Sequence, residues 1–413
     1  MTHELLKGNI LTFVSMQFEG LIGNIMYFLL FIVFLFIYPR LLISQMLWKL
    51  EQTARELEGM TSSAKKIVTR KVSNNPSREL KDAVSNFLEF FIIEPVNLDP
   101  YGIVKKIEHV VDQSEEKFKY FVKKIAPKFD SEAQADLTMG LSGAISLNQI
   151  SKIVRHYVEM VKKMKNLQYG LIIQMQLPLI ERISKALLKG TEALTNGWPI
   201  GDSIGPYIAA GMIDKGLREV EEDIVASKKR IKNRDVIIMK AKGPGGRTGK
   251  LGKAVEKIVK KQKISKIITI DAAAKLEGER TGSVAEGVGV AIGGIGVDRV
   301  YIENIATQKD IPLDSFLIKM SAEEAIMPMR LEILNATPKV VKAVEENIAE
   351  SSRGGKIIVV GVGNTSGVGN DKKSAKEAEL TIKKIIHKVN IQEKEEEKKN
   401  KKGIGWFGSQ FGI

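Results

Sequence analysis

The chain has 413 residues, a formal net charge of +14, four histidines and no cysteine. Its apolar fraction of 44% and aromatic fraction of 6% are those of a globular protein, which excludes wholesale disorder, a collagen-like chain and a polytopic membrane protein. The lack of cysteine excludes disulfides, thiolate metal sites and a cysteine nucleophile. The length predicts two or three domains.

An apolar segment near the N-terminus predicts one transmembrane helix over residues 21–43. Residues 25–38 read IMYFLLFIVFLFIY without a break, and Arg40 is the only charged residue between 21 and 43. Such a segment is close to the roughly 20 apolar residues that span a bilayer core. A run of this kind can also be a buried helix or a signal peptide. No basic region directly precedes it and no small-residue cleavage site follows it, so we interpret it as a retained membrane helix.

Basic residues near the segment predict its orientation. Lys7 is the only Lys or Arg before it, whereas Arg40, Lys49 and Arg55 follow closely. The positive-inside rule therefore predicts a single-pass protein of the cell membrane, with residues 1–20 extracytoplasmic and the bulk of the chain cytoplasmic. The excess of positive charge would favour an anionic inner leaflet. We do not expect nucleic acid as a partner, because the sequence has no zinc finger, RRM aromatic pair or KH loop.

Residues 45–195 predict a helical region. Long charged stretches lack an interior proline, and Asp99-Pro100 combines a capping residue with one that suits a first helical turn. Pro178 predicts a kink, and the apolar stretch around it is too short and too polar for a second span. We interpret the region as an amphipathic bundle at the membrane surface, with a coiled coil or a docking site for protein partners as the alternative.

Residues 196–390 change character, because short β-rich runs alternate with helical stretches. The predicted strands are 236–239, 266–270, 297–303, 315–320 and 356–362, and the predicted helices are 251–263, 322–334, 338–350 and 374–388. This alternation predicts a three-layer α/β domain with a mainly parallel sheet, so the fold class is α/β after an N-terminal transmembrane helix and a helical region. Such sheets bind ligands at the carboxyl ends of their strands.

Residues 391–413 divide into a charged linker, QEKEEEKKNKK, and an aromatic tail with Trp406, Phe407 and Phe411. The linker predicts disorder. The tail is either a frayed terminus or a docking segment for a protein partner or the membrane surface.

Two aspartates are candidate catalytic residues and candidate metal ligands. Asp202 lies in the glycine- and proline-rich turn of GWPIGDSIGPYIAAGMI, where it can cap a helix, ligate a metal or act as a general acid or base. Asp271 follows the predicted strand 266–270, at the position of active-site residues in open α/β sheets. A glycine-rich stretch then extends to residue 294, which indicates either a ligand-binding loop or a structural crossover.

Two glycine-rich loops are candidate sites for an anionic small molecule. In AKGPGGRTGKLGKA (241–254), the glycine N–H groups, Arg247 and Lys250 suit a phosphate, although a solvated basic loop is the alternative. Neither this loop nor VVGVGNTSGVGN (359–370) has the spacing of a Walker A or dinucleotide motif, and the cofactor stays unknown. The candidate binding residues are Gly243, Gly245, Gly246, Arg247, Lys250, Gly361, Gly363 and Asn364.

Two resemblances to families follow from these motifs. The apolar segment, EPVNLDPYGIVKKIEHVVDQ, GWPIGDSIGP and DAAAKLEGERTGSVAEGVGVAIGG together resemble an archaeal membrane-protein family, the domain of unknown function 1512 group. That resemblance covers most of the chain and implies a membrane location without implying an activity.

The second resemblance covers residues 196–370. TNGWPIGDSIGP is similar to the G-N-x-x-x-x-D-x-x-G-P turn of the germination protease of spore formers and the hydrogenase maturation proteases, and TIDAAAKLEG is similar to the V-D-A-L-A-A-R run of the germination protease. It implies a three-layer α/β fold in which Asp202 and Asp271 face each other, sharing a proton or holding a metal. The strand and G-x-G-N that precede the first aspartate in those families correspond here to VVGVGN (359–364), which implies a permuted order.

Two hypotheses therefore stay open. The sequence favours a membrane-anchored protein with a cytoplasmic ligand-binding α/β domain. The alternative is a membrane-tethered, aspartate-dependent, peptidase-like hydrolase that uses Asp202 and Asp271.

Overall fold

The computed structural model describes residues 2–93, 102–164, 167–290, 296–351, 354–389 and 391, with side chains from residue 23 onward except at 39 and 167. The predicted helix start at Asp99-Pro100, the end of the glycine-rich stretch at 291–294, and the linker and tail beyond residue 391 lie outside the described residues. Contacts divide the chain into two units, which are Met1–Leu57 with Ser151–Glu181 and Glu58–Ile150 with Arg182–Ile413.

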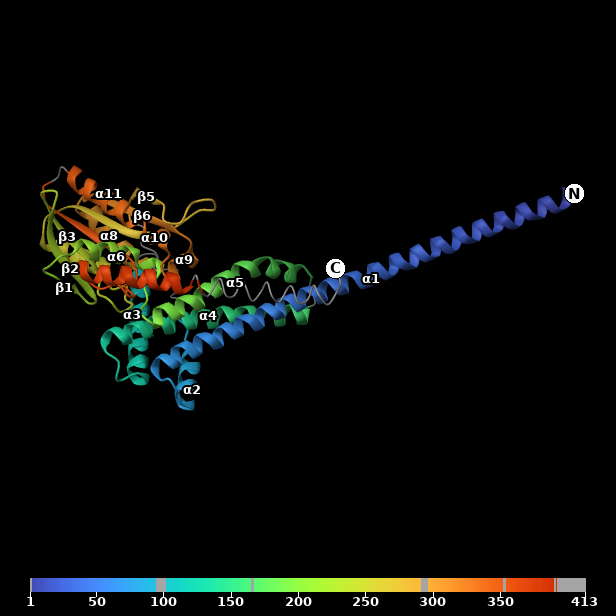
Figure 1. The fold of residues 1–413 in the computed structure, drawn as a ribbon, viewed down its shortest axis with the longest axis horizontal. Coiled ribbons are helices and arrows are strands. Elements are labelled where there is room, and N and C mark those ends of the chain that lie inside the picture. The colour runs from blue at the N-terminus through green and yellow to red at the C-terminus, as the bar shows by residue number, and fades with distance from the viewer. Residues whose placement is uncertain are drawn as a thin grey trace. The chain divides into compact units, whose positions relative to one another are not determined.

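The N-terminal half is helical, as predicted (Figure 1). Its helices are α1 (Thr2–Val72), α2 (Arg78–Phe87), α3 (Ile103–Ile125), α4 (Ser131–Met164) and α5 (Leu167–Thr195). Pro178 lies inside α5. In the second unit, parts of α1 to α4 bury a core of their own, which includes Val68, Val84, Val122 and Leu141.

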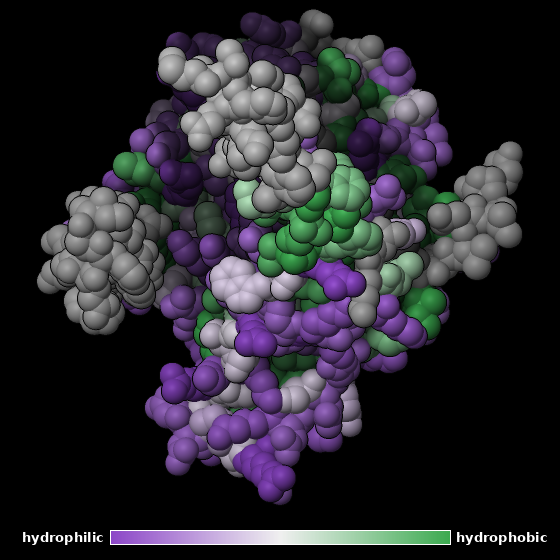
Figure 2. Space-filling model, turned by 90° about the vertical axis from the view of Figure 1, so that its right-hand side faces the viewer, coloured by the Kyte–Doolittle hydropathy of each residue, from purple (hydrophilic) through white to green (hydrophobic). Residues whose placement is uncertain are grey.

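The apolar segment of α1 is exposed rather than buried. Among the described residues, α1 contains a stretch from Gly23 onward that is long and apolar enough to cross a membrane. The large apolar side chains between Ile25 and Tyr38 are mostly exposed, and Figure 2 shows apolar side chains gathered on the surface at this end of the molecule. A core helix of a soluble protein would bury these side chains.

Beyond this segment, α1 is held by the helices of its own unit. Leu50 and Ala54 are fully buried. The Glu51 carboxylate lies 2.7 Å from Lys162 Nζ and 2.9 Å from Arg155 Nη1. Hydrogen bonds from these two cations lower the pKa of Glu51 to about 2. The contacts fix α4 against α1 just after the apolar segment.

The C-terminal half forms one seven-stranded sheet in the order β1-β2-β3-β7-β4-β6-β5. The strands are β1 (Arg218–Glu221), β2 (Ile224–Ile231), β3 (Arg234–Ala241), β4 (Ile264–Ala274), β5 (Val284–Val288), β6 (Leu313–Met320) and β7 (Lys356–Gly361). The four central strands, β3, β7, β4 and β6, are parallel. The sheet is mixed, because β1 and β2 at one edge and β5 at the other pair antiparallel.

Helices cover both faces of the sheet, which confirms the predicted α/β architecture. Ile238 and Val359 belong to a core shared with α6 (Ile204–Met212), α11 (Thr337–Glu350) and a helix of residues 372–389. The alternate residues Ile237 and Ile358 belong to a second core with α7 (Leu251–Lys261) and α8 (Val297–Gln308). Burial on both faces explains why these strands read as continuous apolar runs in the sequence.

Two predicted elements are wrong. Residues 297–303 begin helix α8 rather than a strand, because Ile302, Ile305 and Ala306 are buried at helical spacing. The β-branched residues of this run suggested a strand, but Gly296 and Asp298 mark a helix start. The predicted helix 322–334 is interrupted at Pro328 and forms α9 (Ala322–Ile326) and α10 (Leu331–Leu334) instead, because proline cannot continue a helix.

Candidate functional site

Asp271 lies near the carboxyl end of β4, where the neighbouring strand β7 has already ended. Gly361, the last residue of β7, is the register partner of Ile270. Asp271 is 3% exposed, and its Oδ1 accepts a hydrogen bond from the Ala272 N–H at 2.7 Å. Its Oδ2 is buried and has no hydrogen-bond partner among the described residues. A buried carboxylate oxygen without a partner is costly, so its retention at a strand end points to a function.

Asp202 reaches the same strand ends from the turn before α6. It lies in the 3₁₀ turn Gly201–Ser203, and the residue that precedes α6 is Ser203. Asp202 therefore does not cap α6. Its Oδ2 instead accepts a hydrogen bond of 2.8 Å from the N–H of Asn364, in the loop after β7.

Two glycines permit this close approach. A side chain at Gly205, in the first turn of α6, would meet the carbonyl oxygens of Ile270 and Val362. Gly363 has a φ of +127° and lies against the backbone of Asp202. The chain can thus bring α6 and the loop after β7 onto the end of β4. The loop after β7 lies beside Asp202 in space although it is distant in sequence.

The two carboxyl groups interact electrostatically. Burial, and then the charge of Asp202, raise the pKa of Asp271 well above its usual range. Burial also raises the pKa of Asp202, and the Asn364 N–H opposes that shift. Interacting carboxyl groups titrate as a pair and release their protons in two separate steps. Both directions favour the protonated form, and the shift of Asp271 is the larger because the charge of Asp202 adds to the effect of burial.

Both aspartates line a cavity of about 430 Å³ between α3, α7 and α8. This volume is in the range of small-molecule sites. The other ionisable groups that line it are Glu108, Asp112, Glu115, Lys250, Lys253, Asp298 and Tyr301. The cavity thus contains six carboxyl groups and two lysines.

The wall of this cavity is ordered by its own hydrogen bonds. Tyr301 donates to Glu108 at 2.9 Å and so joins α8 to α3. Asp298 Oδ1 accepts the Gly252 N–H at 2.7 Å. Burial raises the pKa values of Glu115 and Asp298. In the part of the chain that the structure describes, no three His, Asp or Glu side chains are grouped as a metal site.

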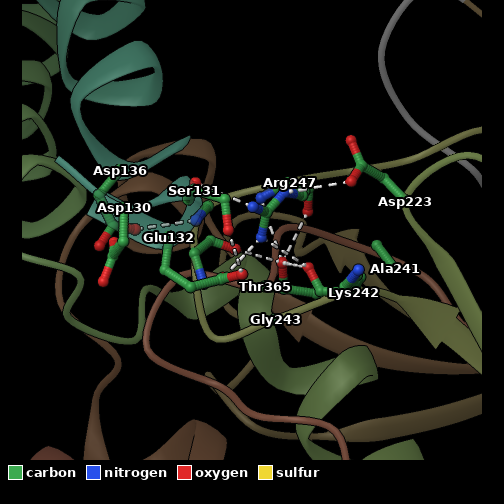
Figure 3. Close-up of polar contacts among 12 residues, drawn as sticks. Asp130, Ser131, Glu132, Asp136, Asp223, Ala241, Lys242, Gly243, Arg247 and Thr365 are labelled. Carbon is green, nitrogen blue, oxygen red and sulfur yellow. Dashed lines mark hydrogen bonds and ion pairs between the residues drawn. The ribbon is translucent and has the colours of Figure 1, made fainter. Parts of the chain in front are cut away.

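The glycine loop after β3 binds carboxylates of the chain itself (Figure 3). The Arg247 guanidinium lies 2.6 Å from Glu132 and 3.3 Å from Asp223. The Gly245 N–H donates to Glu132 at 2.6 Å and the Gly246 N–H donates to Asp136 at 2.8 Å. Figure 3 shows these groups converging on the loop. The loop has the donors that an anion needs, and acidic residues of α4 occupy them.

The remaining candidate residues divide between the two places. The Gly243 N–H donates to Asn370 at 2.8 Å. Lys250 Nζ lies 3.1 Å from Asp112 and 3.7 Å from Glu222, on the wall of the acidic cavity. Gly363 and Asn364 hold Asp202, whereas Gly361 ends β7 beside α6.

Sequence reasoning missed the acidic residues that come from the helical region. Glu132 and Asp136 lie more than 100 residues before the loop they contact, and no local signal marks them. Glu108, Asp112 and Glu115 have the spacing of one helical face, and this pattern could have identified an acidic surface on α3.

Two family models match the chain, one in its N-terminal half and one in its C-terminal half. A model described as "Protein of unknown function (DUF1512) N-terminal domain" matches residues 24–197, and a model described as "Domain of unknown function (DUF1512) C-terminal" matches residues 200–369. No curated protein and no solved structure matches the chain, so the resemblance to the germination and maturation proteases stays a prediction. Because the two models together cover most of the sequence, the chain belongs to the DUF1512 family.

Proposed function

We propose that this chain is a single-pass membrane protein whose α/β domain is an acid-pair hydrolase. The observation that carries the proposal is the convergence of Asp202 and Asp271 on one cavity at the carboxyl ends of parallel strands. Each carboxyl group has a raised pKa, and one buried oxygen of Asp271 has no partner among the described residues. Such perturbed acids in a cavity are typical of catalytic sites.

The pair suits hydrolysis of an amide bond. Ionised Asp202 takes a proton from water as the water oxygen bonds to the carbonyl carbon. Protonated Asp271 stabilises the carbonyl oxygen by hydrogen bonding and donates its proton as the bond between carbon and nitrogen breaks. A site with one ionised and one protonated acid can perform both steps without another group.

The composition of the cavity favours a peptide-like substrate that is rich in donors or positive charge. Six carboxyl groups and two lysines line it, so it would attract cationic groups and N–H donors. The glycine loop is a weaker site for an outside anion, because the Gly245 and Gly246 donors and Arg247 already contact carboxylates. We therefore place the ligand in the acidic cavity, and we propose no cofactor.

The membrane part of the proposal rests on α1. Its large apolar side chains between Ile25 and Tyr38 are mostly exposed, and insertion into a bilayer would remove them from water. The basic residues that follow this segment favour a cytoplasmic location for the α/β domain.

The test is turnover of an internally quenched peptide library by the detergent-solubilised full chain between pH 4 and pH 8. Asp202→Asn and Asp271→Asn should each lower the rate by about 10² to 10⁴, the usual contribution of a general acid or base. The wild-type rate should rise and then fall with pH, because one acid must be ionised and the other protonated. Asp235→Asn is the matched control, because Asp235 is exposed on β3 and does not line the cavity.

Circular dichroism should show that all three variants are folded. Wild-type turnover in either Asp202→Asn or Asp271→Asn would refute the acid pair, as would an equal loss in the Asp235→Asn control.

A further inference from the structure

A second cavity of about 560 Å³ lies on the face of the sheet that α6 and α11 cover, opposite α7 and α8. It is bounded by the β2–β3 turn, the C-terminal end of α6, the first turns of α11 and the helix of residues 372–389. Ile208, Ile231 and Val341 contribute an apolar floor. We refer to it as the basic cleft.

The basic cleft is at the opposite end of the parallel strands from Asp271. Its wall includes the end of β2 and the turn that leads into β3, and β3 runs parallel to β7 and β4. The start of β3 therefore lies at the edge where β4 begins, whereas Asp271 lies near the end of β4. The cleft is thus separate from the acid pair, and its role does not depend on the proposed hydrolysis.

Positive side chains surround this cleft. The ionisable groups of its lining, apart from Tyr207, are Lys229, Arg230, Lys232, Glu345, Lys372 and Lys376. Lys229 pairs with Asp214 at 2.6 Å. In the described part of the chain, none of the ion pairs involves the other four cations, and all four are exposed. These four cations outnumber the single carboxylate of the lining, Glu345, and so create a net positive potential that attracts anions.

The backbone adds to this potential. No side chain caps the N-terminus of α11, which begins with Thr337 in the wall of the cleft. Thr337 Oγ1 is buried and has no hydrogen-bond partner among the described residues. An uncapped helix N-terminus carries a partial positive charge and free N–H donors. The helix end supplies the short-range contacts that dispersed lysines lack.

The β2–β3 turn fixes the backbone of one of the cations. Lys232 and Asn233 both have positive φ values, 47° and 63°. This is the backbone of a two-residue type I′ hairpin, which restricts the position of Lys232 at the mouth of the cleft.

We propose that the basic cleft binds a small molecule that carries a phosphate monoester or polyphosphate group. Its volume is in the range of small-molecule sites, and four unpaired cations match a ligand with at least two negative charges better than a singly charged phosphodiester. The apolar floor would contact the rest of the ligand, and the N-terminus of α11 would bind phosphate oxygens.

The test measures binding of inorganic pyrophosphate to the detergent-solubilised full chain by isothermal titration calorimetry. The Lys232→Gln/Lys372→Gln/Lys376→Gln variant should raise the Kd for pyrophosphate at least tenfold. The matched control is Lys261→Gln/Lys263→Gln/Lys309→Gln, which removes the same charge from exposed positions outside the cleft. The control should bind pyrophosphate as the wild type does.

Several outcomes would overturn the proposal. The proposal fails if the wild type shows no saturable binding of pyrophosphate. It also fails if the cleft variant binds pyrophosphate with the wild-type Kd. Equal weakening in the control variant would mean that net charge alone attracts the anion. A further arm uses glycerophosphoglycerol, the soluble headgroup of an anionic lipid. Binding of this diester as tight as that of pyrophosphate would assign the cleft to lipid headgroups and refute the proposed ligand.

Discussion

The glycine loop after β3 and the acid pair at the end of β4 are located at the same edge of the sheet, on either side of β7. In the loop, the N–H groups of Gly245 and Gly246 and the Arg247 guanidinium all contact carboxylates of the same chain. In the acid pair, Asp271 Oδ2 is buried and contacts no donor among the described residues. One region has completed its hydrogen bonds within the fold, and the other has not.

Whether a polar group has its hydrogen bonds completed within the fold distinguishes a structural residue from a functional one better than the residue type does. Glycines, a basic side chain and a strand end gave the loop the composition of an anion site, yet its role in the fold is to bind α4. Asp202 could equally have capped a helix. A polar group in a folded protein is normally satisfied, so the unsatisfied group is the one that indicates a ligand.

The largest expected effect on stability is in the glycine loop after β3, whose hydrogen bonds are complete within the fold. Arg247→Met would remove the cation that lies beside Glu132 and Asp223 and is 12% exposed. Arg247 is largely buried but its two partners are each 29% exposed, so we expect a loss of about 3 kcal/mol in the free energy of unfolding, the lower end of the range for buried ion pairs. Denaturant unfolding of the full chain measures it.

Arg218→Met is the control for this change, because Arg218 is exposed and belongs to none of the ion pairs among the described residues. It should cost less than about 0.5 kcal/mol. If Arg247→Met were no more destabilising than Arg218→Met, the loop would not be held by its ion pairs.

Lys240, just before the glycine loop, is a buried cation whose charge we expect to be unfavourable. This side chain is fully buried at the end of β3, and its Nζ donates to Ala241 O at 2.7 Å and to Asn370 Oδ1 at 3.0 Å. Burial lowers its pKa to about 7. Between pH 7 and the unfolded value near 10.5, the unfolded chain binds a proton that the folded chain lacks, so stability rises with pH through this window.

Lys240→Met removes the ionisable group and keeps most of its volume. We expect the variant to be more stable than the wild type by about 2–3 kcal/mol at pH 6, and to lose the rise in stability between pH 7 and pH 10. Thermal unfolding at several pH values measures both. A variant that retains the alkaline rise would assign that rise to other groups.

Asp271→Asn tests the other region, the acid pair, whose hydrogen bonds are incomplete. The folded-state pKa of Asp271 is raised above its unfolded value, so the folded chain retains a proton that the unfolded chain releases. Stability conferred by that proton is complete below the unfolded pKa and is lost as pH rises toward the folded pKa. Asparagine keeps the shape of the protonated acid and cannot ionise.

We therefore expect Asp271→Asn to raise the free energy of unfolding by about 1–2 kcal/mol at pH 8 and to have little effect at pH 4. A variant that loses turnover and gains stability is the signature of a residue retained for function. Destabilisation at both pH values would instead assign Asp271 a structural role.

Much of the fold could be predicted from local signals, because both faces of the central strands are buried. VIIM in β3 and KIIVVG in β7 are continuous apolar runs, which parallel buried strands require. Strand β1 was missed because it is a short, charged edge strand, REVE, and β2 was missed because KKR interrupts its apolar residues. The β5 strand lay hidden in a glycine-rich stretch, since its pairing with β6 is a tertiary contact.

The site was predictable in part for a similar reason. Asp271 follows from the rule that strand ends carry functional residues, and Asp202 follows from the resemblance of its turn. Their proximity depends on Gly205 and Gly363 fitting against distant backbone, which no local pattern reveals. The same holds for Glu132 and Asp136, because nothing in α4 indicates that its acids contact a loop 110 residues later.

The smallest expected effect concerns Lys250, the basic residue of the glycine loop that faces the acidic cavity. Its ammonium group lies 3.1 Å from Asp112 and 3.7 Å from Glu222, but the side chains of all three residues are partly exposed. Exposed pairs contribute about 0.2–1 kcal/mol, so Lys250→Met should cost no more than that, well below the cost of Arg247→Met. Denaturant unfolding at low and high salt measures the difference. The loss should decrease at high salt because screening already weakens such pairs. If Lys250→Met cost as much as Arg247→Met at both salt concentrations, the wall of the acidic cavity would be held as tightly as the completed loop, and the contrast between the two regions would not hold.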